Sequence, residues 1–245
     1  MTEIRAVLFD FGGTLYDYGT LAAGEKESLV DLARWTGIEA EPAEVHRSYR
    51  RALRRVFYEY LPQPYYLHRD LFRDALAGMA QDFGAALHDE HVERYRAAQR
   101  RRQRRDFTLR EGVPETLEAL RARGLYLGLV SNIDEDQLSH MRGLGRIDRY
   151  FDSVLSSEEA GSCKPDAAIF EQALRRAGCA PHEALFVGDS IDQDIQGANR
   201  AGLRSVLLWH EPDGQPPERG SRPAQVIRRV PEVLSLIGPE GGDGR

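Results

Sequence analysis

The chain has 245 residues and a formal net charge of -6; 41% of its residues are hydrophobic and 29% are charged. This composition is typical of a globular protein, and the length allows a buried core with a sizeable inserted segment. No apolar run approaches the roughly 18 residues of a membrane span, and the N-terminus lacks the basic start and apolar stretch of a signal peptide. We therefore expect a cytoplasmic protein without a membrane partner.

Five short apolar runs predict strands, at residues 6–9, 125–130, 184–187 and 205–209, with a less apolar run at 151–155. Helical patterns accompany them at residues 113–123, 135–143, 166–177 and 191–201. Apolar strands that alternate with helices predict an α/β fold, a doubly wound Rossmann-like parallel sheet covered on both faces. Ligands of such sheets bind beyond the carboxyl ends of the strands, where these runs meet polar residues.

About a hundred residues between the first two predicted strands show helical periodicity and no convincing strand. Apolar residues recur there at a spacing of three to four, as at Val45, Tyr49, Leu53, Phe57 and Tyr60. The pattern predicts a helical bundle at residues 18–106, inserted into a catalytic core of residues 1–17 and 107–237. The end of the chain, residues 238–245, is rich in glycine and is expected to be disordered.

The basic residues are concentrated in the predicted insert. Residues 44–106 carry 14 arginines against nine acidic residues, whereas the remainder of the chain carries 19 basic against 30 acidic residues. A basic segment beside an acidic core favours an anionic small molecule as the partner. The run from Arg100 to Arg105 does not predict a nucleic-acid partner, because the whole chain is acidic and contains no recognisable nucleic-acid module.

Polar residues with complementary chemistry follow the predicted strands. Asp10 follows the first strand, where a carboxylate nucleophile would be presented. Ser131 follows the second strand and offers a hydroxyl group to phosphate oxygens. Lys164 supplies a compact positive charge, and Asp189 and Asp194 supply hard oxygen ligands suited to Mg²⁺. Together, in this order, these residues predict a site for phosphoryl transfer.

The same residues resemble the four motifs of the haloacid dehalogenase-like (HAD) hydrolases. Asp10 with Thr14 is similar to the first motif, Ser131 to the second, Lys164 to the third, and Gly188-Asp189 with Asp194 to the fourth. The resemblance spans residues 4–15 and 106–209, and the inserted helices resemble the C1-type cap of that family.

The resemblance implies that Asp10 forms an aspartyl-phosphate and that a mobile cap closes on the substrate. The implied phosphate-binding residues are Thr14, Ser131, Asn132 and Lys164, of which Lys164 is also catalytic with Asp10. The expected Mg²⁺ ligands are Asp10, the backbone carbonyl of Gly12, Asp189 and Asp194. Candidates for specificity in the cap include Tyr58, Tyr65, Tyr66 and Arg69.

Gly12 departs from the pattern of the family's phosphatases. They usually carry a second aspartate two residues after the nucleophile, which acts as general acid and base on the leaving group. General acid–base catalysis is typically worth about 100- to 10,000-fold, or about 3 to 5 kcal/mol. Its loss should penalise substrates with poor leaving groups rather than abolish catalysis. We therefore expect a Mg²⁺-dependent phosphatase that acts on a small phosphorylated organic substrate.

Two alternatives fit the same residues. The first is a pseudo-enzyme that binds Mg²⁺ and a phosphorylated ligand in a regulatory role. The second is a phosphonatase-type hydrolase of C–P bonds, which would need a cap lysine that forms a Schiff base. Lys26 is the only lysine in the predicted cap, and it follows Asp10 by only about 16 residues, early for that role.

Overall fold

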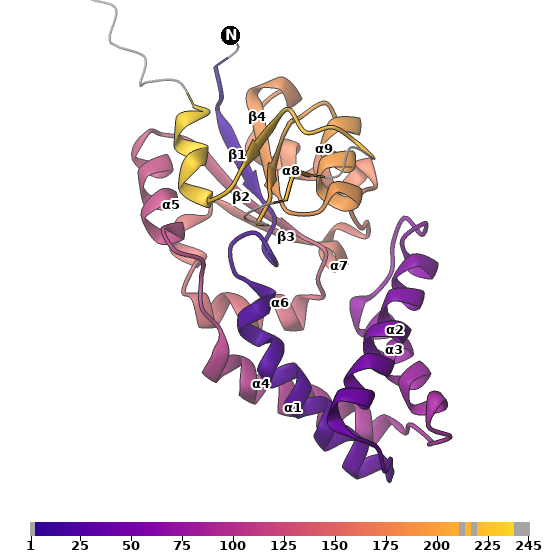
Figure 1. The fold of residues 1–245 in the computed structure, drawn as a ribbon. Coiled ribbons are helices and arrows are strands. Elements are labelled where there is room, and N and C mark those ends of the chain that lie inside the picture. The colour runs from indigo at the N-terminus through magenta and orange to yellow at the C-terminus, as the bar shows by residue number, and fades with distance from the viewer. Residues whose placement is uncertain (1–2, 211–213, 217–219, 238–245) are drawn as a thin grey trace, which may run out of the picture.

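Six parallel strands form one sheet in the computed structural model, which describes residues 3–210, 214–216 and 220–237. In the order β3-β2-β1-β4-β5-β6, the strands span Ser153–Ser156, Tyr126–Ser131, Ala6–Phe9, Ala184–Gly188, Arg204–Leu208 and Gln225–Ile227 (Figure 1). This topology confirms the predicted α/β class. Strand β6 was not predicted because it has only three residues, two of them exposed. The predicted tail, residues 238–245, lies outside the described residues.

Strand β1 lies at the centre of the sheet and is buried on both faces. Val7 and Phe9 pack on the side of α5 (Val113–Ala122), α6 (Glu135–Gly145) and the 3-10 helix η4 (Val230–Ser235). Ala6 and Leu8 pack on the side of α8 (Ala167–Ala177) and α9 (Gln196–Arg200). Because side chains of a strand alternate between faces, an apolar run of four residues fills both layers of the core.

Three short elements complete the core, and the first turn of a predicted helix differs from the prediction. They are the 3-10 helices η1 (Asp148–Tyr150) and η2 (Pro181–Glu183) and the one-turn helix α7 (Ser157–Ala160). The helix predicted over residues 191–201 begins instead as a π-helical turn, η3 (Ile191–Ile195), before α9. The backbone N–H groups of Asp194 and Ile195 both donate to the carbonyl of Ser190, so the wider turn presents Asp194 toward the end of β4.

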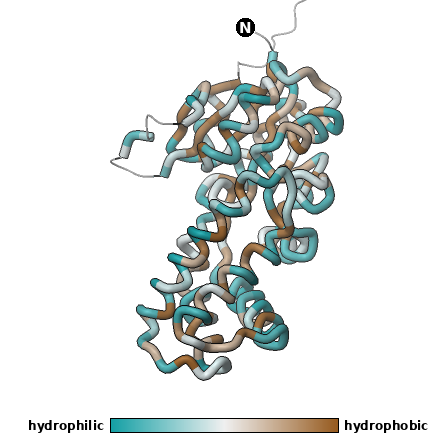
Figure 2. The backbone as a smooth tube through the Cα atoms, turned by 90° about the vertical axis from the view of Figure 1, so that its right-hand side faces the viewer, coloured by the Kyte–Doolittle hydropathy of each residue, from teal (hydrophilic) through white to brown (hydrophobic). Residues whose placement is uncertain are grey.

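Of the five helices between β1 and β2, the first four extend away from the sheet in Figure 1, whereas α5 packs on it. The first four are α1 (Tyr18–Thr36), α2 (Pro42–Tyr60), α3 (His68–Asp82) and α4 (Asp89–Asp106). Helix α1 packs on α4 and α2 packs on α3, around buried residues that include Leu29, Tyr49, Leu76, Met79 and Tyr95. Hydrophobic and hydrophilic positions alternate along these helices in Figure 2, as the predicted 3-to-4 spacing requires.

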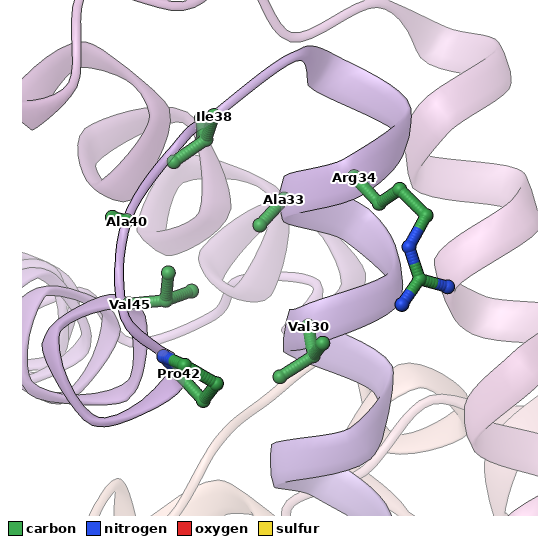
Figure 3. Close-up of a pocket in the computed structure, with 7 residues that line it drawn as sticks. All are labelled: Val30, Ala33, Arg34, Ile38, Ala40, Pro42 and Val45. Carbon is green, nitrogen blue, oxygen red and sulfur yellow. The ribbon is translucent and has the colours of Figure 1, made fainter.

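A small hollow of about 220 Å³ lies between the end of α1 and the start of α2 (Figure 3). Its lining is largely apolar: Val30, Ala33, Arg34, Ile38, Ala40, Pro42 and Val45. None of these residues belongs to the predicted catalytic, phosphate-binding or metal-binding residues. No helix in the described part of the chain is long and apolar enough to cross a membrane.

Candidate active site

The predicted site residues gather at the carboxyl ends of β1, β2 and β4. Asp10 directly follows β1, Ser131 is the last residue of β2, and Asp189 directly follows β4. Strand β1 pairs with β2 on one side and with β4 on the other, so these three residues come from neighbouring strands. The chain adds β2 and β3 on one side of β1 and then crosses to add β4, β5 and β6 on the other, and ligands of open α/β sheets bind where the strand order reverses in this way.

Lys164 joins two buried carboxylates. Its Nζ lies 2.6 Å from Oδ1 of Asp10 and 2.6 Å from Oδ1 of Asp194. The lysine is only 1% exposed, and its backbone is held by the side chain of Asn132. The amide of Asn132 donates to the Lys164 carbonyl at 2.8 Å and accepts from the Lys164 N–H at 2.7 Å. In this structure the Asn132 side chain thus positions Lys164.

Two hydroxyl groups complete the contacts of the Asp10 carboxylate. Ser131 Oγ donates to Asp10 Oδ1 at 3.2 Å, and Thr14 Oγ1 lies 3.3 Å from Asp10 Oδ2. Thr14 Oγ1 also lies 3.2 Å from Oδ1 of Asp189, so it links the ends of β1 and β4. The side chain expected to be the nucleophile is therefore fixed from three directions in a position shielded from water.

Asp10, Asp189 and Asp194 form a cluster in which one oxygen of each carboxylate lies within 4.8 Å of the others. Burial raises the pKa of Asp10 against the opposing charge of Lys164, and Asp194 adds to the rise. Burial and the charges of Asp10 and Asp194 raise the pKa of Asp189 as well. When ionised, these three carboxylates carry more negative charge than the one ammonium group of Lys164 offsets. Its hard oxygen donors fit a divalent cation such as Mg²⁺.

Gly13 shapes the loop that follows Asp10. Its φ is +83°, and a Cβ there would lie 2.2 Å from Oδ2 of Asp189, so only glycine fits. The Gly13 carbonyl accepts from Nε and Nη2 of Arg110 at 3.0 and 2.9 Å, and Nε2 of His210 lies 2.8 Å from it. Arg110 and His210 could not be predicted, because side chains that contact a backbone carbonyl leave no pattern in the sequence.

The space beside Gly12 is filled by two tyrosines. A Cβ on Gly12 would lie 2.1 Å from the hydroxyl oxygen of Tyr18 and 3.0 Å from that of Tyr16. Tyr16 is buried, whereas Tyr18 is 59% exposed overall although its hydroxyl reaches this loop. Burial and the negative charge of Asp10 raise the pKa of Tyr16. Sequence reasoning missed both hydroxyls, because the turn at residues 12–16 that brings them back is not encoded in any periodic pattern.

The connection between α2 and α3 docks on the core beside Lys164. The carboxylate of Asp134 is 3% exposed and accepts from the backbone N–H groups of His68 and Arg69, at 2.8 and 2.7 Å. Arg69 also pairs with Glu158 of α7 at 2.8 Å. Asp134 therefore satisfies two N–H groups at the start of α3, although it lies 65 residues further along the chain.

A second contact of this connection involves the residue before Lys164. The N–H of Cys163 donates to the carbonyl of Pro64 at 2.7 Å, and Cys163 Sγ lies 3.4 Å from the carbonyl of Tyr66. Tyr66 and Arg69, two of the specificity candidates, thus lie at the junction, whereas Tyr58 is 61% exposed on α2.

The arginine-rich run of α4 is engaged in ion pairs. Arg100 binds Asp136 of α6 at 2.5 Å, and Arg102 and Arg105 bind Glu27 of α1 at 2.9 and 3.0 Å. Arg100, Arg102 and Arg105 thus link α4 to α6 and to α1.

Lys26, on which the phosphonatase alternative depends, is exposed on α1. Burial lowers the pKa of His46 near the start of α2, and the positive charge of Lys26 lowers it further. No hydrogen bond or ion pair within the described residues joins Lys26 to Asp10.

Comparison with known proteins gives the same family as the motifs. A family model described as a haloacid dehalogenase-like hydrolase matches residues 4–202. The chain is 33% identical over 240 residues to the glyceraldehyde 3-phosphate phosphatase of Methanopyrus kandleri, which covers 96% of this chain and 97% of that protein. It is 31% identical over 248 residues to the ribulose-1,5-bisphosphate 5-phosphatase of Halopiger xanaduensis, over 95% of this chain and 96% of that protein.

A solved structure agrees on the fold. The HAD-hydrolase YfnB from Bacillus subtilis, bound to magnesium, superposes with a TM-score of 0.77 at 19% identity, over 96% of this chain and 99% of that one. The chain therefore belongs to the haloacid dehalogenase-like hydrolase family.

Proposed function

We propose that this protein is a Mg²⁺-dependent phosphatase that hydrolyses the phosphate ester of a small organic molecule through an aspartyl-phosphate on Asp10. The observation that carries the proposal is the Asp10 carboxylate itself. It is buried at the end of β1, held by Lys164, Ser131 and Thr14, and it stands beside the carboxylate of Asp189. This arrangement leaves a carboxylate oriented for attack and surrounded by groups that bind phosphate oxygens.

The names of the two relatives support the substrate class. Glyceraldehyde 3-phosphate and ribulose-1,5-bisphosphate are both phosphate esters of short hydroxylated carbon chains. The leaving group of such an ester is an alkoxide, which departs less readily than an aryl oxide. The proposed substrate is therefore an alkyl phosphate of this size, and the site has to cope with a poor leaving group.

Each residue has a part in the proposed mechanism. Asp10 attacks phosphorus, the ester P–O bond breaks, and water then hydrolyses the acyl phosphate to regenerate Asp10. Lys164 offsets the charge of the phosphoryl oxygens while Ser131 and Thr14 donate hydrogen bonds to them. Mg²⁺, held by Asp10, Asp189 and the Gly12 carbonyl with Asp194 beside them, would supply further positive charge at the phosphoryl group.

We also propose that helices α1–α4 act as a cap over this site. The support is the docking of the α2–α3 connection on Asp134 and Cys163, which lie close in sequence to Asn132 and Lys164. A cap placed there would exclude water from the phosphoryl group. We place the enzyme in the cytoplasm, with small phosphorylated substrates and neither nucleic acid nor membrane as partners.

The decisive experiment is a phosphate-release assay with Mg²⁺ and with EDTA. The panel contains p-nitrophenyl phosphate, glyceraldehyde 3-phosphate and other small phosphate esters, and Asp10→Asn is the matched control because it keeps the size of the side chain. We expect Mg²⁺-dependent release by the wild type and none by the variant. Wild-type turnover no greater than that of Asp10→Asn would favour the pseudo-enzyme alternative instead.

A further inference from the structure

We propose that the hydroxyl of Tyr18 is a catalytic group that donates a hydrogen bond to the leaving oxygen of the substrate, in place of the carboxyl group absent at Gly12. The inference rests on the proposed phosphatase function and identifies which residue of this chain handles a poor leaving group. It starts from the space next to Gly12, which two hydroxyl groups fill.

The Tyr18 hydroxyl lies about as far from the Cβ place of residue 12 as a carboxyl oxygen would. A carboxyl oxygen lies two bonds beyond Cβ, or about 2.4 Å from it with ordinary bond lengths. The Tyr18 hydroxyl oxygen lies 2.1 Å from the place where a Cβ of residue 12 would stand, and its ring carbon Cζ lies 2.7 Å from that place. An aromatic side chain from the start of α1 thus brings one polar atom into the space that a side chain at position 12 would enter.

The neighbouring residues hold the Tyr18 ring so that its hydroxyl lies next to Gly12. The ring packs edge-on against Tyr16 with centroids 5.4 Å apart, and Tyr16 packs in the same manner on Phe11 at 4.9 Å. Asp17, the residue before Tyr18, accepts from the N–H of Gly19 at 2.7 Å and so begins helix α1. Because the ring is 59% exposed while its hydroxyl reaches the Gly12 loop, Tyr18 lies between solvent and the site.

The Tyr18 hydroxyl carries its proton at neutral pH, because a tyrosine ordinarily loses it only at about pH 10. A protonated hydroxyl can donate to an oxygen that gains negative charge, which is when a hydrogen bond is strongest.

The proposed step balances without a proton lost by Tyr18. As Asp10 forms its bond to phosphorus, the ester P–O bond breaks and its electron pair stays on the leaving oxygen. Tyr18 stabilises that oxygen by hydrogen bonding, and a water molecule gives it the proton that completes the alcohol. The hydroxide left from that water attacks the phosphorus of the aspartyl-phosphate and releases Asp10 and phosphate. The benefit is largest for alkyl esters, because an aryl oxide spreads its charge over the ring.

The test compares Tyr18→Phe with the wild type on an alkyl phosphate, glyceraldehyde 3-phosphate, and on an aryl phosphate, p-nitrophenyl phosphate. We expect kcat on the alkyl ester to fall by about 10- to 100-fold, the usual range for a hydrogen bond to a charged group. We expect kcat on the aryl ester to change by less than about threefold. Tyr126→Phe, at the amino end of β2 and so at the opposite end of that strand from Ser131, is the matched control and should leave both rates unchanged.

The outcomes separate this inference from the proposed function. An equal loss on both esters, or no loss on the alkyl ester, would overturn the role of Tyr18 while leaving the phosphatase intact. So would a Tyr16→Phe variant that reproduces the selective loss when Tyr18→Phe does not, or a wild type that hydrolyses only the aryl ester. A wild type no more active than Asp10→Asn would overturn the proposed function and this inference with it. Since phenylalanine keeps the ring, equal melting temperatures should show that the fold is unaffected.

Discussion

Nζ of Lys164 lies 2.6 Å from Oδ1 of Asp10, in a place where Lys164 is 1% and Asp10 6% exposed. A buried ion pair of this kind contributes little beyond a well-packed apolar pair, but removal of one partner leaves the other charge without compensation. Asp194 shares the ammonium group at the same distance, so Lys164 is the nearest positive charge to two carboxylates. A compact ammonium fits between them, whereas a planar guanidinium does not have that shape.

Lys164→Met should therefore destabilise the protein by about 3 to 5 kcal/mol near neutral pH. The loss depends on pH, because Lys164 opposes the rise in the pKa of Asp10 and its removal lets that pKa rise further. A carboxyl group whose pKa is higher in the folded than in the unfolded state stabilises the fold at low pH and loses that effect as pH rises. The difference from wild type should thus be larger at about pH 8 than at about pH 5.

Urea unfolding in EDTA at both pH values measures this difference, and Lys26→Met on the exposed face of α1 is the matched control. If Lys164→Met and the wild type differed by the same free energy of unfolding at both pH values, the ion pair would not govern the charge of Asp10.

Mg²⁺ should raise the melting temperature through the carboxylate cluster. A ligand present at about 100 times its Kd stabilises the folded state by about 2.7 kcal/mol, or about 5 to 10 °C for a chain of this size. Asp189→Asn should remove most of the shift, because Asp189 belongs to the cluster. Asp192→Asn replaces an exposed aspartate of η3 and should keep the rise in melting temperature on addition of Mg²⁺. A shift of wild-type size in Asp189→Asn would place the cation elsewhere.

The sequence predicted the convergence of the site residues because strands in a parallel sheet end at one edge. Asp10, Ser131 and Asp189 each follow an apolar run, and those runs became neighbouring strands. Lys164 and Asp194 were placed by their resemblance to family motifs rather than by periodicity. The π-helical turn that aims Asp194 at Lys164 was not foreseen, because a helix pattern does not distinguish a wide first turn from a regular one.

Contacts that depend on tertiary geometry were beyond the sequence. Asp134 caps α3 from 65 residues away, and Tyr18 fills a space that exists only because residue 12 is glycine. Neither contact leaves a signal in residue spacing or composition. Asp134 binds backbone N–H groups, which every residue except proline has, and Tyr18 fills a space that only the folded chain defines. The identity of the group that compensates for Gly12 therefore had to come from the folded chain.

Lys26→Ala should leave phosphate release unchanged, because Lys26 is exposed on α1 and its charge acts on His46. Treatment with borohydride in the presence of a phosphonate that carries an aldehyde group should not inactivate the wild type, since no Schiff base is expected. Covalent trapping that disappears in Lys26→Ala would revive the phosphonatase alternative.

Asp134→Ala should loosen the docking of the α2–α3 connection. Two backbone N–H groups, those of His68 and Arg69, would lose their acceptor, at a cost of about 1 to 2 kcal/mol for a helix start. Hydrogen exchange at residues 64–70 should accelerate, with a smaller change in Asp134→Asn, which keeps one acceptor oxygen. Asp148→Ala, at an exposed aspartate of the core, is the control. Exchange at wild-type rates in Asp134→Ala would mean that other contacts suffice to hold the connection.

Gly12→Asp restores the carboxyl group typical of the family's phosphatases, but the structure predicts that this change alone brings little benefit. Its Cβ would stand 2.1 Å from the hydroxyl oxygen and 2.7 Å from Cζ of Tyr18, so the ring has to swing outward before the carboxylate can settle. The variant then exchanges one donor for another and strains the start of α1.

Shortening the side chain with Tyr18→Ala removes the clash. We expect the double variant to hydrolyse alkyl phosphates at least about tenfold faster than Gly12→Asp, within the range of general acid–base catalysis. Tyr18→Ala alone supplies the baseline and should be slower than either wild type or the double variant. Equal rates in Gly12→Asp and the double variant would show that Tyr18 does not obstruct the space at residue 12.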